Sequence, residues 1–368
     1  MKMVIIGPVY PYRGGISHHT TFLAENLRKA GVEVHILSFK RQYPLWLYPG
    51  SSDKDTSILP LKIDAKFLLD PFNPLSWIKT LSEIKNLKPN LVIFQWWTTF
   101  WVIAYKFLCL FLTKNKIKIL FLIHNIFPHE TRFWDPILVK LILTNNIEYI
   151  VQSSREKQKM KELLPRKDVY LVEHPIFNIQ KENLINSKDA KEKLQIDSDI
   201  KVLLFFGIVR PYKGLELLIK SLKTIINDHS NNINLVIAGE FWEPVEKYFD
   251  LISNLSLERF VKIYNKYIPN EEIPIFFSAA DVFVAPYKNG TQSGAVKLAM
   301  GYGLPLVITN VIKDESMEKL NNIWIAEENN EEKLVKNIIL ALNNGKKTSV
   351  HLDDKWNDMI KLIMELGS

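Results

Sequence analysis

Short runs of Val, Ile and Leu alternate with longer segments of helical periodicity along the chain, and this alternation occurs twice. In the first half the apolar runs cover residues 3–6, 34–39, 91–94, 119–123 and 149–151. In the second half they cover residues 202–206, 234–238, 261–264, 282–285 and 305–309, with a weaker run at 323–325. Strands that are apolar on both faces and separated by helices are typical of parallel sheets covered on both sides. The pattern therefore predicts an α/β chain with two doubly wound sheets.

The length of the chain agrees with this division, because 368 residues can form two domains of ordinary size. A polar stretch at residues 178–200 has no buried-strand pattern and is expected to hold the linker and an exposed helix. We expect a Rossmann-like domain at residues 1–185, a second one at 186–350, and a closing C-terminal helix at 351–368. Ligands bind outside the carboxyl ends of such strands, so we expect the two domains to face a central cleft.

Composition narrows the classes of function. The formal net charge of +7 favours an anionic partner, but the basic residues are spread along the chain and form no nucleic-acid-binding tail. Cys109 is the only cysteine, which excludes an internal disulfide and an all-cysteine zinc site. The longest apolar run, residues 100–112, is shorter than the roughly 20 residues that a membrane-spanning helix needs. The first apolar run is too short for a signal-peptide core, so we expect a cytoplasmic protein.

Two glycines lie in the loop that follows the first predicted strand. Gly14 and Gly15 precede a helix that is expected to begin near Ser17, and they let backbone N–H groups approach a ligand closely. The G-x-G-x-x-G spacing of a dinucleotide site is absent. The loop is either a tight strand-to-helix turn or a binding loop for negative or polar oxygen groups.

A histidine directly follows the fourth predicted strand. His124 begins a segment that also contains His129 and Glu130. A histidine at the carboxyl end of a strand can meet a substrate as a hydrogen-bond donor or acceptor, depending on its tautomer. We predict that His124 contacts substrate, and that His129 and Glu130 lie behind it or bind the acceptor. Zinc binding is the less favoured alternative, because no other His/Cys pair offers companion ligands.

The second half begins with a basic turn after its first predicted strand. Arg210 and Lys213 lie between Gly207 and Gly214, and a predicted helix follows at residues 215–222. An arginine offers planar bidentate donors and a lysine a compact point charge, so the pair can clamp a diphosphate. The alternative is a solvated basic turn, which the position at a strand's carboxyl end makes the weaker interpretation.

A polar loop at residues 286–294 leads into the helical run 295–301. Thr291, Gln292, Ser293 and Gly294 place small hydrogen-bonding groups and free N–H donors at the start of this helix, an arrangement that binds anions. A simple helix cap is the alternative.

Two further features have competing interpretations. Trp96, Trp97 and Trp101 follow the third predicted strand, where they can stack on sugar rings, belong to the core or form a membrane-facing apolar patch. Asp197-Ser-Asp199 has the spacing of a metal-binding D-x-D site, but it precedes a strand within the polar linker, so we interpret it as a solvated turn.

Taken in order along almost the whole chain, these motifs resemble the retaining GT-B glycosyltransferases of glycosyltransferase family four, the group 1 glycosyltransferases. The resemblance is carried by four segments: Arg13-Gly-Gly15, Gly207 with Arg210-Pro-Tyr-Lys-Gly214, residues 267–281, and Gly303-Leu-Pro305. It implies two Rossmann-like domains, with the sugar nucleotide held mainly by the second, the acceptor mainly by the first, and no catalytic metal.

The resemblance also implies roles for particular residues. His124 is expected to hydrogen-bond the transferred sugar, and Arg210 with Lys213 to neutralise the diphosphate. The expected donor-binding residues are Gly14, Gly15, Gly207, Gly239, Ile268, Pro269, Thr291, Gln292, Ser293 and Gly294. The acceptor-side candidates are His18, Trp96, Trp97, His129 and Glu130.

Two departures from the family pattern bear on the donor. The family carries an arginine directly after the glycine where this chain has Ile208, so Arg210 must take over that role. Two glutamates that bracket the last loop in the family, one for the donor sugar and one for the ribose, fall on Gly290 and Leu298. Thr291, Gln292 and Ser293 can supply substitute hydrogen bonds.

The predicted activity is retaining, metal-independent transfer of a sugar from a UDP- or GDP-linked donor, with no cofactor, in cell-surface polysaccharide biosynthesis. The acceptor is expected to be a hydroxyl of a glycan or lipid-linked saccharide, and an anionic membrane surface, suggested by residues 40–48, is a further partner. The alternative is a catalytically silent GT-B protein that binds a sugar nucleotide or a glycan. A nicotinamide-dependent dehydrogenase is disfavoured because the dinucleotide motif is missing, and a metal-dependent transferase would rest on Asp197 and Asp199 alone.

Overall fold

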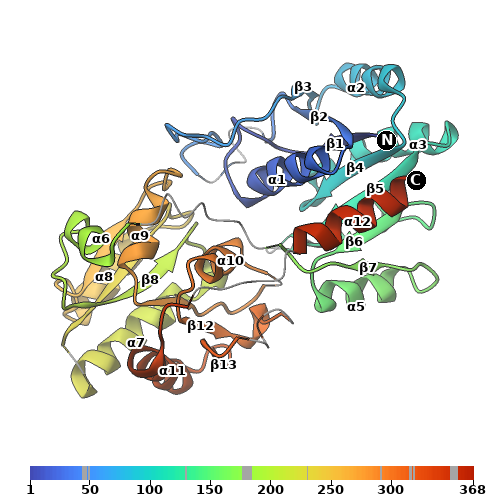
Figure 1. Cartoon of the computed structure of the whole chain (residues 1–368). Coiled ribbons are helices and arrows are strands. Elements are labelled where there is room, and N and C mark those ends of the chain that lie inside the picture. The colour runs from blue at the N-terminus through green and yellow to red at the C-terminus, as the bar shows by residue number, and fades with distance from the viewer. Residues whose placement is uncertain are drawn as a thin grey trace. The chain divides into compact units, whose positions relative to one another are not determined.

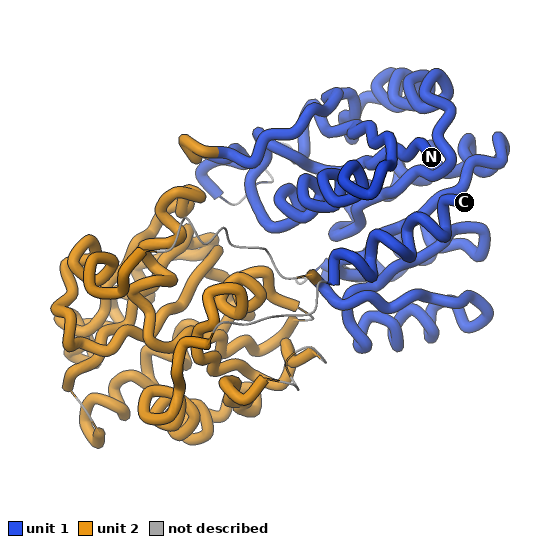
Figure 2. The backbone as a smooth tube through the Cα atoms, viewed as in Figure 1, with its two compact units in different colours: residues 1–55, 60–174, 354–368 blue, residues 56–59, 175–353 orange. Residues whose placement is uncertain are grey.

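The chain forms two compact units in a computed structural model (Figure 2). Unit 1 contains residues 1–55, 60–174 and 354–368, and unit 2 contains residues 56–59 and 175–353. The structure describes residues 1–43, 48, 50–128, 131–175, 185–229, 231–290, 292–314, 317, 320–348 and 355–368. In this part of the chain no helix is long and apolar enough to cross a membrane.

Unit 1 is built on a seven-stranded parallel sheet with the order β3-β2-β1-β4-β5-β6-β7 (Figure 1). Its strands are β1 (Lys2–Ile6), β2 (Glu33–Phe39), β3 (Lys66–Leu69), β4 (Leu91–Trp96), β5 (Lys118–Ile123), β6 (Glu148–Val151) and β7 (Tyr170–Leu171). The chain starts in the middle of the sheet and winds first to one edge and then to the other. This switch between β1 and β4 brings the loops after both strands to the same edge, where ligands bind in such folds.

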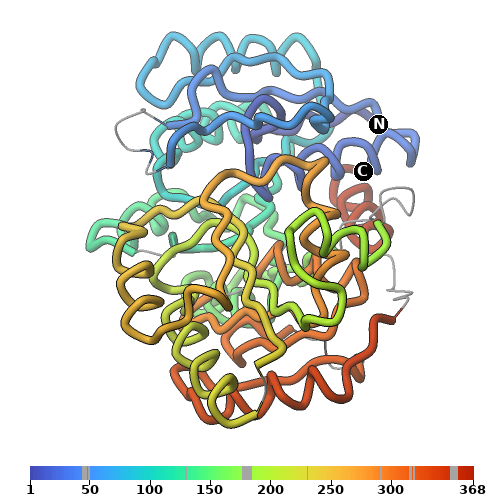
Figure 3. Tube along the Cα trace, turned by 90° about the vertical axis from the view of Figure 1, so that its left-hand side faces the viewer, coloured from blue at the N-terminus to red at the C-terminus, as the bar shows by residue number. Residues whose placement is uncertain are grey.

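Helices cover both faces of this sheet. One face packs on α2 (Pro74–Leu87), α3 (Val102–Lys114), α4 (Asp135–Ile142) and α5 (Ser154–Leu163), with the 3-10 turn η2 (Thr99–Trp101) before α3. The other face packs on α1 (Gly15–Lys29) and α12 (Lys355–Gly367). The first helix, blue, and the last helix, dark red, lie side by side (Figures 1 and 3). The last helix therefore completes the core that the first strand begins.

Unit 2 repeats the same plan with a six-stranded parallel sheet of order β10-β9-β8-β11-β12-β13. Its strands are β8 (Lys201–Phe206), β9 (Ile233–Ala238), β10 (Val261–Tyr264), β11 (Val282–Ala285), β12 (Leu306–Thr309) and β13 (Ile323–Ala326). One face packs on α6 (Ser187–Lys193), α9 (Ile273–Ala279) and α10 (Gly294–Gly301), and the other on α7 (Leu215–Asp228), α8 (Glu246–Asn254) and α11 (Glu331–Asn344). Short 3-10 turns are η4 (Pro211–Lys213) and η5 (Asn310–Ile312).

The predicted strands are confirmed within a residue or two at each end, and two edge strands, β3 and β7, were not predicted. The polar stretch at 178–200 holds α6, and its D-x-D segment forms an exposed turn, with the Ile200 amide donating to the Asp197 carbonyl at 3.1 Å. The units do not follow the contiguous limits expected at 185 and 350. Trp356, Met359 and Ile363 of the closing helix belong to the core of unit 1, because their apolar face covers its sheet.

Candidate functional site

The basic turn of unit 2 has a backbone that only glycine fits. Gly207 and Gly214 adopt φ values of 101° and 71°, in the left-handed region. A Cβ on Gly214 would lie 2.0 Å from the Pro286 carbonyl oxygen. The turn after β8 is thus pressed against the loop after β11, at the carboxyl ends of two neighbouring strands.

This close contact gives a testable requirement. Gly214→Ala is expected to lower the free energy of unfolding by about 2 kcal/mol, because it adds a left-handed penalty to a steric clash. Gly15→Ala is the matched control, since a Cβ there meets nothing within 4 Å. Urea denaturation of both variants measures the difference. Equal losses would show that the Gly214 contact is not the cause.

Lys213 is a buried cation in this turn. Its side chain lies only 9% exposed, and its Nζ lies 5.5 Å from the centre of the Tyr287 ring. Within the described residues no carboxylate forms an ion pair with it. Burial lowers the pKa of Lys213, the Arg210 charge lowers it further, and Tyr212 opposes the shift. An ammonium group that is desolvated without a counter-ion attracts an anionic ligand strongly.

Arg210 lies on an aromatic face next to this lysine. Its guanidinium carbon is 5.1 Å from the centre of the Trp242 ring. The Trp242 indole N–H donates to Oε2 of the buried Glu240 at 2.8 Å. Gly239 allows the loops after β8 and β9 to meet, because a Cβ there would lie 2.1 Å from the Gly207 carbonyl oxygen. The structure therefore brings four predicted residues together: Gly207, Arg210, Lys213 and Gly239.

The loop before α10 contacts the same region through Tyr287. The Tyr287 hydroxyl lies 3.1 Å from Ser293 Oγ, and Ser293 caps α10 by accepting from the Val296 amide. Burial raises the pKa of Tyr287 to about 12, so the ring that faces Lys213 stays neutral. Both carboxamide heteroatoms of Gln292 are buried without a hydrogen-bond partner. Such a group is rare in a folded protein and marks a position that a ligand can satisfy.

Gly290 and Leu298, which stand where the family has glutamates, have roles in the packing of unit 2. Leu298 packs against the core, and Gly290 has a φ of 152°. Between them, Lys297 forms a buried ion pair with Asp314, at 2.6 Å between Nζ and Oδ2. Gly294 is the first residue of α10, and Thr291 lies outside the described residues.

The segment expected to flank the base packs mainly against protein. The Ile268 side chain is buried in the core of unit 2, so only its backbone and Pro269 stay available. The backbone N–H of Asn270 donates to Ser57 Oγ at 2.9 Å, and Oε1 of Glu271 accepts from the backbone N–H of Ile58 at 3.0 Å. Residues 56–59 thus join unit 2 through this loop (Figure 2).

In unit 1 the glycine loop leaves the start of α1 uncapped. Gly14 has a φ of 110°, and no side chain caps the helix. Added Cβ atoms on Gly14 and Gly15 would meet nothing within 4 Å. The N-terminal amides of α1 are therefore not shielded by a neighbouring side chain at these positions, which suits an oxygen-rich ligand.

His124 is buried and neutral. Its Nε2 lies 2.6 Å from the amide oxygen of Gln95, which can only accept, so the ring donates from Nε2 and keeps a lone pair on Nδ1. Burial lowers the pKa of His124 to about 3, His174 lowers it further, and Gln152 opposes the shift. The ring meets His19 edge-on at 4.8 Å between centroids. His124 can therefore accept a hydrogen bond from a substrate hydroxyl but cannot act as a cation near neutral pH.

The other acceptor-side candidates differ in position. Trp96 is buried in the core and donates to the Ile126 carbonyl at 3.1 Å, so it is a packing residue and not a sugar platform. Trp97 is half-buried and donates to the Tyr43 hydroxyl at 2.6 Å. His18 has a buried Nε2 without a partner, and burial lowers its pKa. His129 and Glu130 lie outside the described residues.

Several groups around these sites were not singled out in the sequence. They are Gln95, Gln152 and His19 beside His124, and Glu240, Trp242 and Tyr287 beside the basic turn. Trp242 follows β9 by a few residues, so the rule that sites lie at strand carboxyl ends could have found it. Among the described residues, no group of three or more His, Cys, Asp or Glu side chains is arranged to hold a metal ion.

Comparison with known proteins places these two halves in a family. The family model for Glycosyltransferase Family 4 matches residues 13–176, and the model for Glycosyl transferases group 1 matches residues 186–356. YtcC of Bacillus subtilis is 38% identical over 128 residues, which cover 33% of this chain and 31% of YtcC. The chain thus spans about a third of the length of this curated relative.

Solved structures share the fold over nearly the full length. Anabaena HepE, in a complex with UDP-glucose, has a TM-score of 0.73 at 13% identity and covers 99% of both chains. WaaG, described as a glycosyltransferase involved in lipopolysaccharide biosynthesis, has a TM-score of 0.64 at 13% identity, covering 99% of this chain and 95% of its own. The predicted GT-B fold is confirmed by these likenesses and the two parallel sheets. With both family models matched in order along its length, the chain belongs to the group 1, family-four-like glycosyltransferases.

Proposed function

We propose that the protein transfers a sugar from a UDP- or GDP-linked donor to a hydroxyl of a glycan or lipid-linked saccharide, with retention and without a metal. The observation that carries the proposal is the buried ammonium of Lys213, which pairs with no carboxylate among the described residues, beside Arg210 at the carboxyl end of β8. A buried lysine next to a half-buried arginine suits a diphosphate. Relatives with the same fold support this chemistry, since HepE is described in complex with UDP-glucose.

The proposed reaction separates charge between sugar and diphosphate. As the bond between the anomeric carbon and the phosphate oxygen breaks, its electron pair stays on the diphosphate. Arg210, Lys213 and the amides at the start of α10 stabilise that charge, an electrostatic effect that is strongest where water is excluded. The acceptor hydroxyl attacks from the face that the diphosphate leaves and passes its proton to the departing phosphate oxygen, so the anomeric configuration is retained.

The first unit is assigned to the sugar and the acceptor. The Nδ1 lone pair of His124 accepts a hydroxyl hydrogen of the transferred sugar, and the amides after Gly14 and Gly15 bind its oxygens. WaaG is described as involved in lipopolysaccharide biosynthesis, which supports a cell-surface polysaccharide as the product. A cytoplasmic, membrane-peripheral location is part of the same proposal.

Thermal-shift screening of the full chain against nucleotides and sugar nucleotides tests the donor. A bound donor is expected to raise the apparent melting temperature, because a ligand of the folded state stabilises it. The donor that binds is then used in a transfer assay with saccharide acceptors, with and without a chelator, and the rate is expected to persist with the chelator. Absence of both binding and transfer across the panel, with Arg210→Ala and Lys213→Ala unchanged from the parent, would contradict the proposal.

A silent binding protein is the second candidate. The observation that favours it is the replacement of the two family glutamates by Gly290 and Leu298, with Leu298 packed against the core. Calorimetry that shows donor binding without hydrolysis or transfer would select this alternative.

A further inference from the structure

One face of unit 1 exposes an unusual number of large apolar side chains. Of the fifteen large hydrophobic residues that are exposed in the described part of the chain, ten lie between residues 72 and 141. We call these ten the apolar face: Phe72, Leu75, Ile78, Ile103, Leu110, Phe111, Phe133, Trp134, Ile137 and Leu141. They lie on or just before α2, α3 and α4, the helices that cover the same side of the sheet.

These three helices form a continuous surface. Trp77 of α2 lies 5.7 Å from Phe107 of α3 between ring centroids, and Lys85 Nζ lies 5.6 Å from the centre of the Phe111 ring. On the other side, α3 packs against α4, and Thr99 of η2 hydrogen-bonds the buried Asp135. Exposed residues on neighbouring helices therefore belong to one face and are not scattered single side chains.

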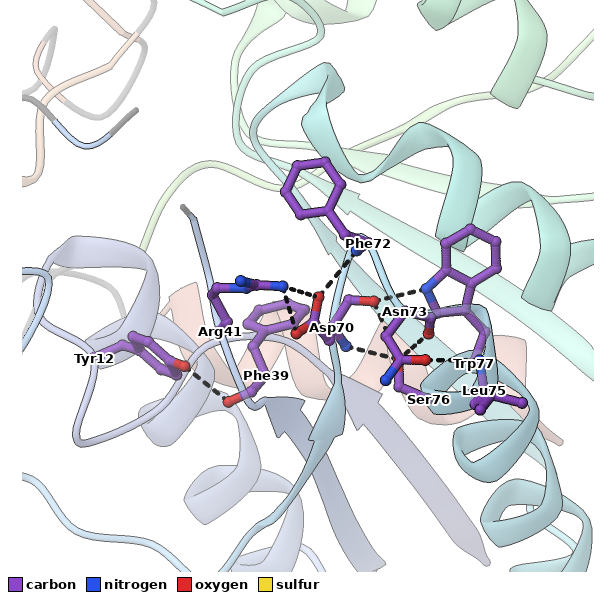
Figure 4. A network of polar contacts seen from close by, with 9 residues as sticks. All are labelled: Tyr12, Phe39, Arg41, Asp70, Phe72, Asn73, Leu75, Ser76 and Trp77. Atoms are coloured by element: carbon purple, nitrogen blue, oxygen red, sulfur yellow. Dashed lines mark hydrogen bonds and ion pairs between the residues drawn. The ribbon is translucent and has the colours of Figure 1, made fainter. Parts of the chain in front are cut away.

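The edge of this face is held in place by a polar network (Figure 4). Both Asp70 carboxylate oxygens bond Arg41, each at 2.9 Å, and one also accepts from the Phe72 amide. The Asp70 carbonyl accepts from the Trp77 indole at 2.7 Å and from Ser76 Oγ at 3.1 Å. Phe72 and the start of α2 are thus fixed before any partner binds, so little conformational freedom is lost on binding.

The same segment has an excess of basic over acidic residues. Residues 71–147 contain nine Lys or Arg and three Asp or Glu, a formal +6 against +7 for the whole chain. Of the three acids, Asp135 is buried and Glu83 pairs with Lys66 at 2.6 Å. The exposed basic residues on the three helices include Lys79, Lys85 and Lys140. Apolar side chains with lysines around them are typical of surfaces that bind anionic lipids.

We infer that the apolar face and its lysines dock on an anionic phospholipid bilayer. A second copy of the chain fits this face less well, because two surfaces that both carry an excess of lysines repel each other when they meet. The inference deepens the membrane partner of the proposed function and places it on α2, α3 and α4. Lipid binding itself needs neither donor nor transfer, so it can fail or hold independently of the proposed activity.

Co-sedimentation of the full chain with vesicles tests the inference. Vesicles of phosphatidylcholine with phosphatidylglycerol, and of phosphatidylcholine alone, are compared at low and high salt without donor or acceptor. The parent is expected to partition onto the anionic vesicles at low salt and to be released by salt, because screening weakens the lysine contribution. Absence of binding to anionic vesicles at low salt would overturn the inference.

Variants separate the apolar and the charged contributions. Ile103→Ser with Leu110→Ser removes two exposed α3 side chains and is expected to weaken partitioning at least about tenfold. Lys79→Gln with Lys140→Gln is expected to weaken it about fivefold per lysine. Phe249→Ser on α8, 51% exposed, and Lys336→Gln on α11 are the matched controls in unit 2 and are expected to bind like the parent.

Three further measurements decide the outcome. Circular dichroism and melting temperature should be unchanged in all variants, because every replaced side chain is exposed. Donor binding without vesicles should also be unchanged, which separates failure of lipid binding from failure of the proposed function. Equal loss in the controls, or a dimer in sedimentation velocity that the α3 variant abolishes, would overturn the inference.

Discussion

Replacing Lys213 with methionine is expected to lower kcat/KM for transfer by about 10²–10³, the usual effect of removing one preorganised electrostatic contact from a developing charge. The ammonium is buried against the Tyr287 ring, so water cannot replace it when the diphosphate leaves. Lys213→Arg should recover part of the rate, because the positive charge remains. The recovery is expected to be incomplete because there is little space for the larger guanidinium: a Cβ on Gly207 would lie 3.3 Å from Nζ of Lys213. Initial-rate kinetics with the donor found by thermal shift measure both.

The same variant is expected to be more stable than the parent. A desolvated cation without a counter-ion costs free energy, so Lys213→Met should raise the free energy of unfolding by on the order of 1 kcal/mol. The folded pKa of Lys213 is lowered, so the unfolded chain binds more protons between that pKa and 10.5. The parent's stability should therefore rise with pH through that window relative to the variant. Lys336→Met is the control, and a variant that loses both activity and stability would contradict this account.

Replacing His124 with alanine is expected to lower kcat by about 10²-fold, because the transferred sugar loses a preorganised hydrogen-bond acceptor. The parent should show no rate change from this residue between about pH 5 and 8, since burial holds the pKa of His124 at about 3. Initial rates of the parent and the variant measure the loss in kcat. The pH dependence of the parent's kcat, together with the NMR chemical shifts of the imidazole nitrogens, shows whether His124 titrates. His35→Asn, on β2 next to Glu33, is the control.

The stability of the protein should also depend on His124 in acid. The pKa of His124 is about 3 in the folded chain and 6.5 in the unfolded chain. As the pH falls through this range, His124 is protonated in the unfolded chain but stays neutral in the folded one. Stability is therefore lost between pH 6.5 and 3, by roughly a few kcal/mol in full. His124→Gln should flatten this part of the curve in urea denaturation at several pH values. A titration near pH 6.5 in the parent's rate, absent from the variant, would show that His124 is not held neutral.

The core strands could be predicted because their sequences are apolar on both faces. β4, for example, is buried at every position, and its run of Leu, Val, Ile and Phe is visible in the sequence. β3 and β7 lie at the edges of the sheet, are only partly buried and are short, so they lack that signature. The basic turn and the glycine loops were predictable for another reason, because they follow strands directly and sites gather at strand carboxyl ends.

Side-chain environments could not be predicted in the same way. The bond between Gln95 and His124 depends on the pairing of β4 with β5, which the sequence does not state. Trp96 and Trp97 are adjacent, yet one is in the core and the other half-buried, because Trp96 is the last residue of β4 and Trp97 lies in the loop that follows. The burial of Lys213 depends on Tyr287, which lies far away in the sequence.

The packing of α12 on α1 has a consequence for how the chain is made. Synthesis proceeds from the N-terminus, so the sheet of unit 1 emerges before unit 2, and the helix α12 that covers it emerges after unit 2. Until then the apolar residues that Trp356, Met359 and Ile363 will cover stay open to the solvent. Nascent chains, and any fragment cut near residue 185, should therefore bind chaperones at this surface as long as α12 is not yet in place.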